Sequence, residues 1–270
     1  MQRKQVDSYL DAHGTITFNM TNDYMFRYVL QKNKKVLKGL ICSLLHLHPE
    51  QIQSIEITNP IDLFENIYGK DFILDINVFL NNDTMINLEM QVTNESNWPD
   101  RSLSYLCRSF DQLYRGQNYN EALPVYHIGF LDFTLFPNTP EFYSTYKMQN
   151  VKNGNVYSSK FILSVVDLSC IELATDEDRF YGIDYWARVF KAKTWEKLKM
   201  LSKDNEYLQE AADSIYMANA DEIVRQRCLA REEAERRERT LERDIRLLKE
   251  ENEKLKKEIE NLKKKIGDGE

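Results

Sequence analysis

The residues best suited to chemistry in this chain are Asp75, Glu89 and Gln91, in the stretch LDINVFLNNDTMINLEMQV (74–92). The stretch is typical of two apolar strands joined by a polar turn, and a buried hairpin needs neither carboxylate. Side chains alternate between the two faces of a strand, so Glu89 and Gln91 share one face and the apolar even-numbered residues share the other. The hairpin is therefore predicted to have a core face and a polar face.

The register of this hairpin decides whether the two carboxylates meet. A three-residue loop at Asn81–Asp83 pairs odd-numbered residues with odd-numbered residues and places Asp75 opposite Glu89, whereas a two-residue loop separates them. The loop residues Asn-Asn-Asp tolerate the left-handed conformation that a three-residue hairpin requires. We therefore predict strands over roughly 71–80 and 85–93, with the carboxylates facing each other.

Two carboxylates whose Cβ atoms are ~5 Å apart repel each other unless they share a proton or a cation. Mg²⁺ or Mn²⁺ suits oxygen ligands and leaves positions open for water and phosphate. Such an ion lowers the pKa of bound water, which is the chemistry of metal-assisted phosphodiester hydrolysis. Gln91 can orient that water or contact phosphate, although an amide cannot act as a general base. The competing interpretation is a hairpin whose polar face only meets solvent.

Helices and further strands are predicted around the hairpin. Thr21 is the expected N-cap of a helix that runs to about Leu47. The order that follows is a short strand near Gln53–Thr58, the hairpin, a helix over 101–116, a buried strand over 124–136, more strand within 141–170, and helix from about 178 onward. The expected fold class is α/β (α+β), a mixed sheet flanked by helices and followed by a C-terminal helical region.

Composition limits the classes of protein to consider. The chain has 270 residues, 42% of them hydrophobic and 29% charged, which is typical of a globular protein. The net charge of −7 argues against a generic nucleic-acid binder, so any DNA contact needs a local basic surface. Four well-separated cysteines without a CxxC motif, and no apolar run long enough to span a membrane, favour a cytoplasmic protein.

The order of elements, with Asp on the second strand and E-x-Q on the third, resembles the core of PD-(D/E)XK nucleases. More narrowly, the chain resembles the Rpn-type recombination-promoting nucleases, a transposase-like family in which E-x-Q replaces E-x-K. The resemblance covers roughly residues 20–235. The matching segments are TNDYMFRYVL (21–30), LDINVFL and INLEMQV (74–92), RSLSYLCRSFDQLYRGQNY (101–119), LPVYHIGFLDF (123–133) and ADEIVRQRCLAREEA (220–234).

The resemblance implies a metal-dependent DNA endonuclease linked to recombination, mobile elements or defence. It assigns the Mg²⁺ or Mn²⁺ ligands to Asp75, Glu89 and the backbone carbonyl of Met90, and gives Gln91 the place of the usual lysine. The upstream acid of the family falls on Asp23, which is alternatively an acid favoured by the dipole at a helix N-terminus. A different function remains open, namely a catalytically weak or inactive nuclease-like protein that binds DNA or regulates.

The helix after the hairpin has basic and aromatic residues at a helical spacing. Arg101, Tyr105 and Arg108 lie on one face of it. These three residues either contact the DNA backbone or hold the helix to the sheet.

The C-terminal segment predicts a coiled coil. Apolar residues follow a 3.5-residue period, with isoleucine at a positions and leucine at d positions, which favours two parallel strands. The acidic g residues, Glu251 among them, each meet a basic e residue such as Lys256 in a parallel pair. The dimerisation stripe is Leu241, Ile245, Leu248, Asn252, Leu255, Ile259, Leu262 and Ile266. We therefore expect a homodimer built from an N-terminal extension (1–20), a nuclease core (21–175), a helical region (176–230) and a coiled coil (231–270).

Overall fold

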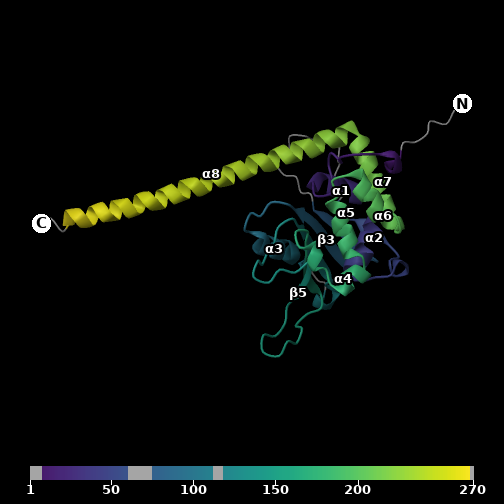
Figure 1. The fold of residues 1–270 in the computed structure, drawn as a ribbon. Coiled ribbons are helices and arrows are strands. Elements are labelled where there is room, and N and C mark those ends of the chain that lie inside the picture. Colours follow the sequence, from purple (N-terminus) through teal and green to yellow (C-terminus); the bar gives the residue numbers. More distant parts are fainter. Residues whose placement is uncertain (1–7, 60–74, 112–117, 268–270) are drawn as a thin grey trace. The chain divides into compact units, whose positions relative to one another are not determined.

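The computed structural model describes residues 8–59, 75–111 and 118–267, and Figure 1 shows its helices and strands. The chain divides into two compact units, Met1–Leu229 and Ala230–Glu270. The first unit contains the mixed sheet flanked by helices that the sequence predicts. None of the helices in the described ranges is long and apolar enough to cross a membrane.

Within the described residues, six strands form one sheet in the order β1-β2-β3-β4-β6-β5. β3, β4 and β6 run parallel to one another, while β1, β2 and β5 pair antiparallel with their neighbours. The apolar strand expected over 124–136 is central as predicted, although it ends earlier, at Leu131. The strands are β1 (Ile55–Ile57), β2 (Ile76–Leu80), β3 (Thr84–Gln91), β4 (Val125–Leu131), β5 (Tyr143–Lys147) and β6 (Phe161–Asp167).

The single helix predicted from Thr21 to Leu47 is wrong, because the chain forms two helices there. α1 (Asp23–Lys32) is capped by Asn22, whose side chain accepts from the N–H of Met25, and not by Thr21. Asn33 ends α1 and caps α2 (Lys34–Leu45) by accepting from two backbone N–H groups. A side chain that satisfies the first N–H groups of a new helix competes with continuing the old one.

The helix expected over 101–116 begins earlier than predicted. α3 spans Trp98–Phe110, with Pro99 in its first turn, where a missing N–H costs nothing. Pro99 is therefore part of the helix. Residues 112–116 of the prediction, like residues 71–74 of the hairpin, lie outside the described residues.

The region predicted as helix from about 178 consists of separate short helices. Each begins after a residue that interrupts the previous one, for example Gly182, Thr194 and Asn205. The elements are α4 (Asp176–Phe180), α5 (Ile183–Phe190), α6 (Trp195–Ser202) and α7 (Glu206–Ala220). Large apolar residues of these helices are buried: Trp186, Val189, Phe190, Trp195 and Leu198.

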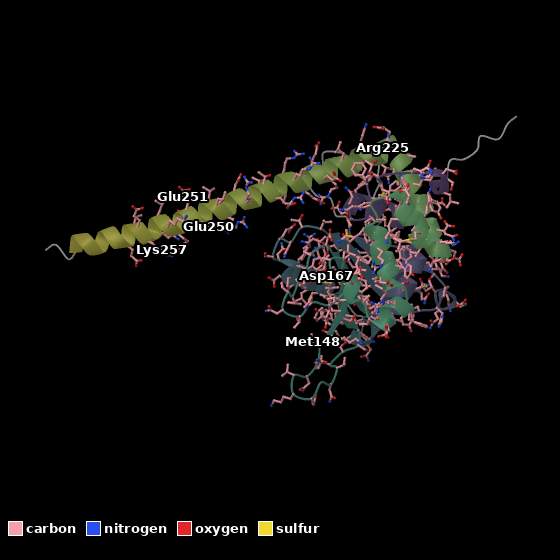
Figure 2. All side chains as sticks on the ribbon, in the orientation of Figure 1. Met148, Asp167, Arg225, Glu250, Glu251 and Lys257 are labelled. Carbon is pink, nitrogen blue, oxygen red and sulfur yellow. The ribbon has the colours of Figure 1, made fainter. Side chains whose placement is uncertain are left out.

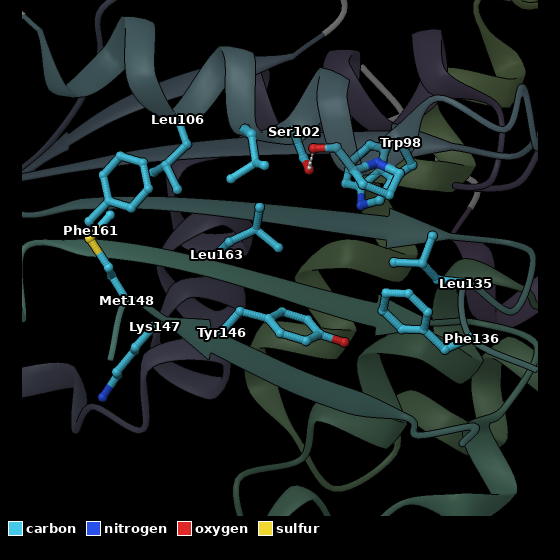
Figure 3. A pocket seen from close by; sticks show the side chains of 12 residues that line it. Trp98, Ser102, Leu106, Leu135, Phe136, Tyr146, Lys147, Met148, Phe161 and Leu163 are labelled. Carbon is cyan, nitrogen blue, oxygen red and sulfur yellow. Dashed lines mark hydrogen bonds between the residues drawn. The ribbon is translucent and has the colours of Figure 1, made fainter. Parts of the chain in front are cut away.

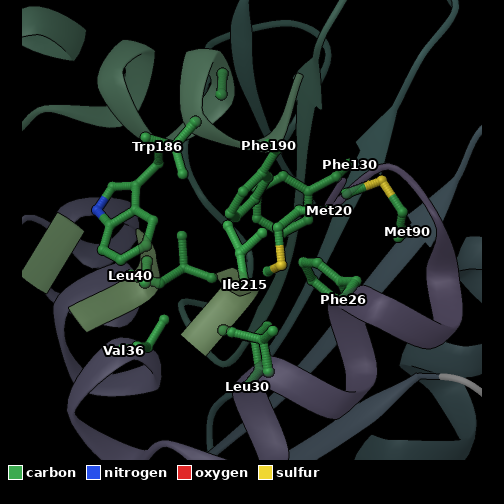
Figure 4. Packing of buried hydrophobic residues seen from close by; sticks show 14 of the residues in the cluster. Met20, Phe26, Leu30, Val36, Leu40, Met90, Phe130, Trp186, Phe190 and Ile215 are labelled. Carbon is green, nitrogen blue, oxygen red and sulfur yellow. The ribbon is translucent and has the colours of Figure 1, made fainter. Parts of the chain in front are cut away.

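Two hydrophobic clusters hold the sheet between its helices. The larger joins one face of the sheet to α1, α2, α5 and α7, and Figure 4 shows Phe26, Phe130 and Phe190 meeting at its centre. The smaller lies beneath α3, where Trp98 and Leu106 pack against β4 and β6. Helices therefore cover both faces of the sheet at its central strands.

α8 (Glu222–Gly267) begins inside the first unit. Val224 and Cys228 on its first turns are fully buried. The Nδ2 of Asn22, the cap of α1, donates to the backbone oxygen of Cys228 at 3.1 Å. The start of α8 is therefore part of the packing of the first unit.

The outer part of α8 exposes the residues of the predicted heptad stripe. Those described are Leu241, Ile245, Leu248, Asn252, Leu255 and Ile259, all exposed. The side chains of Leu262 and Ile266 lie outside the described residues. Charged side chains such as Glu250, Glu251 and Lys257 project from the same helix (Figure 2). The stripe is not buried within one chain, and its pairing with a second chain stays a prediction.

Candidate active site

The hairpin of β2 and β3 places Asp75 and Glu89 in the predicted register. Ile76 pairs with Leu88, so Asp75, one residue earlier, lies opposite Glu89. The loop has three residues, and its first two, Asn81 and Asn82, have φ angles of 51° and 59°. Asparagine tolerates this left-handed region well, which explains the loop sequence.

The polar face of the hairpin is buried, which rules out a solvated strand face. The exposed fractions are 7% for Asp75, 5% for Glu89 and 7% for Gln91. α3 packs across this face of the sheet. Burying two carboxylates is costly unless something compensates their charge, so this arrangement needs a chemical explanation.

Three oxygens in this group have no hydrogen-bond partner among the described residues: Oδ1 of Asp75, Oε2 of Glu89 and Oε1 of Gln91. The other polar atom of each residue has a partner, and in Glu89 this is Oε1, which lies 2.7 Å from Nη2 of Arg101. Oδ2 of Asp75 accepts from Asn87 at 2.5 Å, and Nε2 of Gln91 donates to the carbonyl of Thr93 at 2.9 Å.

Buried acceptors without a donor are rare in native proteins, and hard cations such as Mg²⁺ bind oxygens of this kind. The donor set therefore fits a divalent ion. Within the described ranges, no three His, Cys, Asp or Glu side chains are grouped to hold a metal. The set that fits is thus two carboxylates and an amide.

Arg101 of α3 is the direct partner of Glu89. Its Nη2 lies 2.7 Å from Oε1 of Glu89, and its Nη1 lies 3.7 Å from Oε2 of Glu95. Tyr105 and Arg108 lie on the same face of α3 as Arg101. The guanidinium carbons of Arg101 and Arg108 lie 5.7 and 5.8 Å from the centre of the Tyr105 ring. Of the two roles predicted for Arg101, holding the helix to the sheet is the one that this contact performs.

The protonation of Glu89 is set by its surroundings. Its pKa is raised to about 7, chiefly by burial and also by the carboxylate of Asp75, while the positive charge of Arg101 works in the opposite direction. Glu89 therefore changes charge near neutral pH. A bound cation acts against burial and favours the charged carboxylate.

A family model described as PD-(D/E)XK nuclease family transposase matches residues 20–244. The chain belongs to this family. Comparisons with curated proteins and with solved structures returned no match. Membership in the PD-(D/E)XK family means a nuclease-like protein, a hydrolase that acts on nucleic acids, and enzymes of this superfamily generally use divalent metal ions. Asp75 directly precedes β2, Glu89 and Gln91 lie on β3, and all three fall within the residues that the family model matches.

His127 lies beside Glu89, and the sequence interpretation missed it. It is fully buried on β4, and its Nε2 lies 3.7 Å from Oε2 of Glu89. Burial and the charge of Arg101 lower its pKa to about 3, so the imidazole is neutral. The rings of Tyr105 and Trp98 enclose it, with centres 6.0 and 5.6 Å away. The sequence signal that could have indicated His127 is its position as a histidine inside a nearly continuous apolar strand.

Gly129 lets α3 approach the sheet beside Glu89, its register partner on β3. A Cβ at this position would lie 2.0 Å from Cζ2 of Trp98, closer than side chains tolerate. The glycine therefore makes room for the indole ring. Trp98 in turn fixes the first turn of the helix that carries Arg101.

Arg27 of α1 supports the other carboxylate, and sequence reasoning also missed it. The side chain is fully buried and donates to the backbone oxygens of Asp75 and Asn59. Burial lowers its pKa to about 10, opposed by the charge of Asp75, so it stays positive at neutral pH. Because Arg27 contacts the main chain, it would position residue 75 even if the aspartate side chain were replaced.

Two predicted ligands occupy different surroundings. Asp23 is buried in the first turn of α1, next to the capping residue Asn22. The side chain of Met90 packs in the large apolar cluster, as Figure 4 shows, so only its backbone carbonyl is suited to an ion. Both assignments stay predictions.

A different face of α3 lines an apolar cavity of about 370 Å³. Trp98, Ser102 and Leu106 point into it from the helix, opposite Tyr146 of β5 (Figure 3). No carboxylate lines it. The cavity is thus separate from the carboxylate group, and α3 is a wall of both.

Proposed function

We propose that this chain is a Mg²⁺- or Mn²⁺-dependent endonuclease of the Rpn type that hydrolyses phosphodiester bonds of DNA in recombination, mobile elements or defence. The observation that carries the proposal is the set of buried oxygens on Asp75, Glu89 and Gln91 that have no hydrogen-bond partner among the residues the structure describes. Their position within the residues that the PD-(D/E)XK family model matches supports the same reading. The proposal includes a cytoplasmic location, because a DNA substrate is found there and because widely spaced cysteines are typical of reduced thiols in that compartment.

Each residue has a defined part in this proposal. Asp75 and Glu89 hold the ion, with the carbonyl of Met90 and the carboxylate of Asp23 as further candidate ligands. The bound ion supplies a water of lowered pKa and stabilises negative charge that develops on the phosphate. Gln91, which is uncharged, orients water or phosphate through its amide.

DNA contact is assigned to α3. The guanidinium carbon of the exposed Arg108 lies 5.8 Å from the centre of the Tyr105 ring, on the helix whose Arg101 contacts Glu89. Arginine suits phosphate because its planar group donates several hydrogen bonds at once. A local basic surface of this kind is needed in a chain whose net charge is −7.

The assembly proposed is a parallel homodimer through the outer part of α8. Its apolar a and d residues, exposed in the single chain, support a partner helix. Two nuclease cores joined in this way suit the cutting of both strands of a duplex.

The enzyme proposal is tested by nicking of supercoiled plasmid with Mg²⁺, Mn²⁺ or EDTA. We expect metal-dependent cutting that Asp75→Ala abolishes, since one of the two carboxylate ligands is lost. Asp83→Ala is the matched control, because it removes an exposed carboxylate from the turn of the same hairpin. Equal cutting by Asp75→Ala and the unaltered chain would show that this site does not carry out the cutting.

One observation favours a second candidate function, a DNA-binding or regulatory protein without useful turnover. Glu89 is already paired with Arg101 at 2.7 Å, so its charge is compensated without a metal. Tight binding of duplex DNA with no nicking in either metal would support this alternative.

A further inference from the structure

Glu89 is bound by a cation that belongs to the chain itself. The guanidinium of Arg101 reaches Oε1 of Glu89, while Oε2 of the same carboxylate has no hydrogen-bond donor. The side chain of Glu89 is 6% exposed, so a charged partner matters more here than on the surface. Arg101 therefore compensates the carboxylate that a divalent ion would use.

Arg101 is held on Glu89 from one side only. Its side chain is 37% exposed, and its Nε has no hydrogen-bond partner among the described residues. Moving it off Glu89 therefore returns an already half-exposed group to water. By contrast, Arg27, the cation near Asp75, is fully buried and bound to backbone oxygens.

A second carboxylate, that of Glu95, lies beside Arg101. Oε2 of Glu95 lies 3.7 Å from Nη1, and the Glu95 side chain is 19% exposed. This distance is too long for a hydrogen bond and short enough for a small movement to close it. The Tyr105 ring, 5.7 Å from the guanidinium carbon, borders the same path.

We propose that Arg101 is an exchangeable counter-ion that occupies Glu89 until a divalent metal binds, and then moves to Glu95 and to the DNA phosphate. This inference rests on the proposed metal site and adds its regulation. Arg101 keeps the buried carboxylates compensated when no ion is bound. Metal binding then turns a group that blocks the site into one that faces the substrate.

The exchange predicts that Arg101 opposes metal binding. Removing Arg101 should tighten metal binding, because the ion no longer has to break a charged hydrogen bond. The gain expected for Mn²⁺ is about tenfold or more. Removing the charge of Glu95 should weaken binding in the unaltered chain, because the displaced Arg101 loses the second carboxylate to which it can move.

The test is calorimetric titration of the full chain with Mn²⁺. The variants are Arg101→Met, Glu95→Gln, the two combined, and Arg108→Met, a control that removes an exposed charge from the same face of α3. Melting curves check that each folds, and Arg101→Gln, which keeps a donor for Glu89 without the charge, replaces Arg101→Met if that variant does not fold.

Tighter binding in Arg101→Met than in Arg108→Met, together with no effect of Glu95→Gln once Arg101 is gone, supports the exchange. If the two substitutions acted only through net charge, their effects on the free energy of Mn²⁺ binding would add in the double variant. Unchanged or weaker binding in Arg101→Met, or an equal effect of Glu95→Gln with and without Arg101, overturns it.

Asp75→Asn separates this outcome from a failure of the metal site. If the unaltered chain binds Mn²⁺ in a way that Asp75→Asn abolishes, the metal site stands even when the exchange fails. If no variant binds Mn²⁺ through Asp75, the metal site and the exchange both fall.

Discussion

At the scale of residues, the site is a group of buried polar side chains whose charges depend on one another. Asp75 and Glu89 repel, Arg101 attracts Glu89, and burial penalises every charged form. His127 is neutral beside them and adds no charge. The two carboxylates are therefore tolerated because a cation lies next to them, whether this is the arginine or a metal ion.

The raised pKa of Glu89 predicts how stability depends on pH in the absence of metal. The carboxyl binds its proton up to about pH 7 in the folded chain and up to about pH 4.5 when unfolded. The folded state thus holds more protons in that window, so stability is greatest below it and falls as pH rises from 4.5 to 7.

We expect Glu89→Gln to remove most of this loss, which amounts to at most about 3 kcal/mol. Melting temperatures in EDTA at pH 5 and pH 8 measure it, and Glu121→Gln, on the surface, is the control. Curves that fall in parallel for the unaltered chain and Glu89→Gln would contradict the assignment.

At the scale of elements, the site exists because α3 packs on the polar face of the hairpin. That contact depends on Gly129 of β4, which leaves room for Trp98 at the start of the helix. Because α3 carries Arg101, the approach of the helix determines whether the guanidinium reaches Glu89. Packing of one apolar ring thus controls an ionic contact on the next turn.

Gly129→Ala should displace α3 and destabilise the chain by roughly 1–3 kcal/mol, the usual cost of overpacking. Urea unfolding measures the loss. In Trp98→Leu, whose smaller side chain leaves space, the same alanine should cost clearly less. An equal cost in both backgrounds would show that the clash with the indole is not the cause.

The hairpin could be predicted from sequence because its determinants are local. Alternation of apolar residues fixes the faces, and Asn81 and Asn82 suit the turn, so Asp75 and Glu89 were placed correctly. His127 and Arg101 could not be placed, since their contacts with Glu89 depend on the parallel pairing of β3 with β4 and on the packing of α3. The break at Asn33 was missed because the apolar spacing continues across it, while the capping side chain decides the geometry.

At the scale of the whole molecule, the compact first unit is followed by a long charged helix with an exposed apolar stripe. Contiguous exposed apolar patches often mark surfaces that bind another protein. The predicted parallel pairing adds attractive contacts between g and e residues such as Glu251 and Lys256, each worth ~0.2–1 kcal/mol. Many small contacts then act together along the helix.

Sedimentation of the full chain should give a dimer mass that Leu248→Lys with Leu255→Lys reduces to a monomer. Two charges on the stripe oppose its burial, whereas Glu250→Lys, on the outer face of the same helix, should leave the mass unchanged. A monomer at every concentration of the unaltered chain would contradict the dimer.

Asn252→Val tests the register separately. A polar a residue lowers the stability of a coiled coil and fixes its alignment, so the valine should keep or raise the melting temperature of assembly while allowing larger oligomers. Circular dichroism and sedimentation measure the two effects. Loss of assembly would place Asn252 outside the stripe.

The exposure of this stripe in the single chain has a consequence for the cell that makes the protein. Pairing of two identical chains follows mass action, so the paired fraction depends steeply on copy number when the chain is scarce. A nuclease that needs both cores to sever a duplex would leave the host chromosome largely intact at low gene dosage. The same helix would allow rapid cutting once expression rises, without any separate inhibitor.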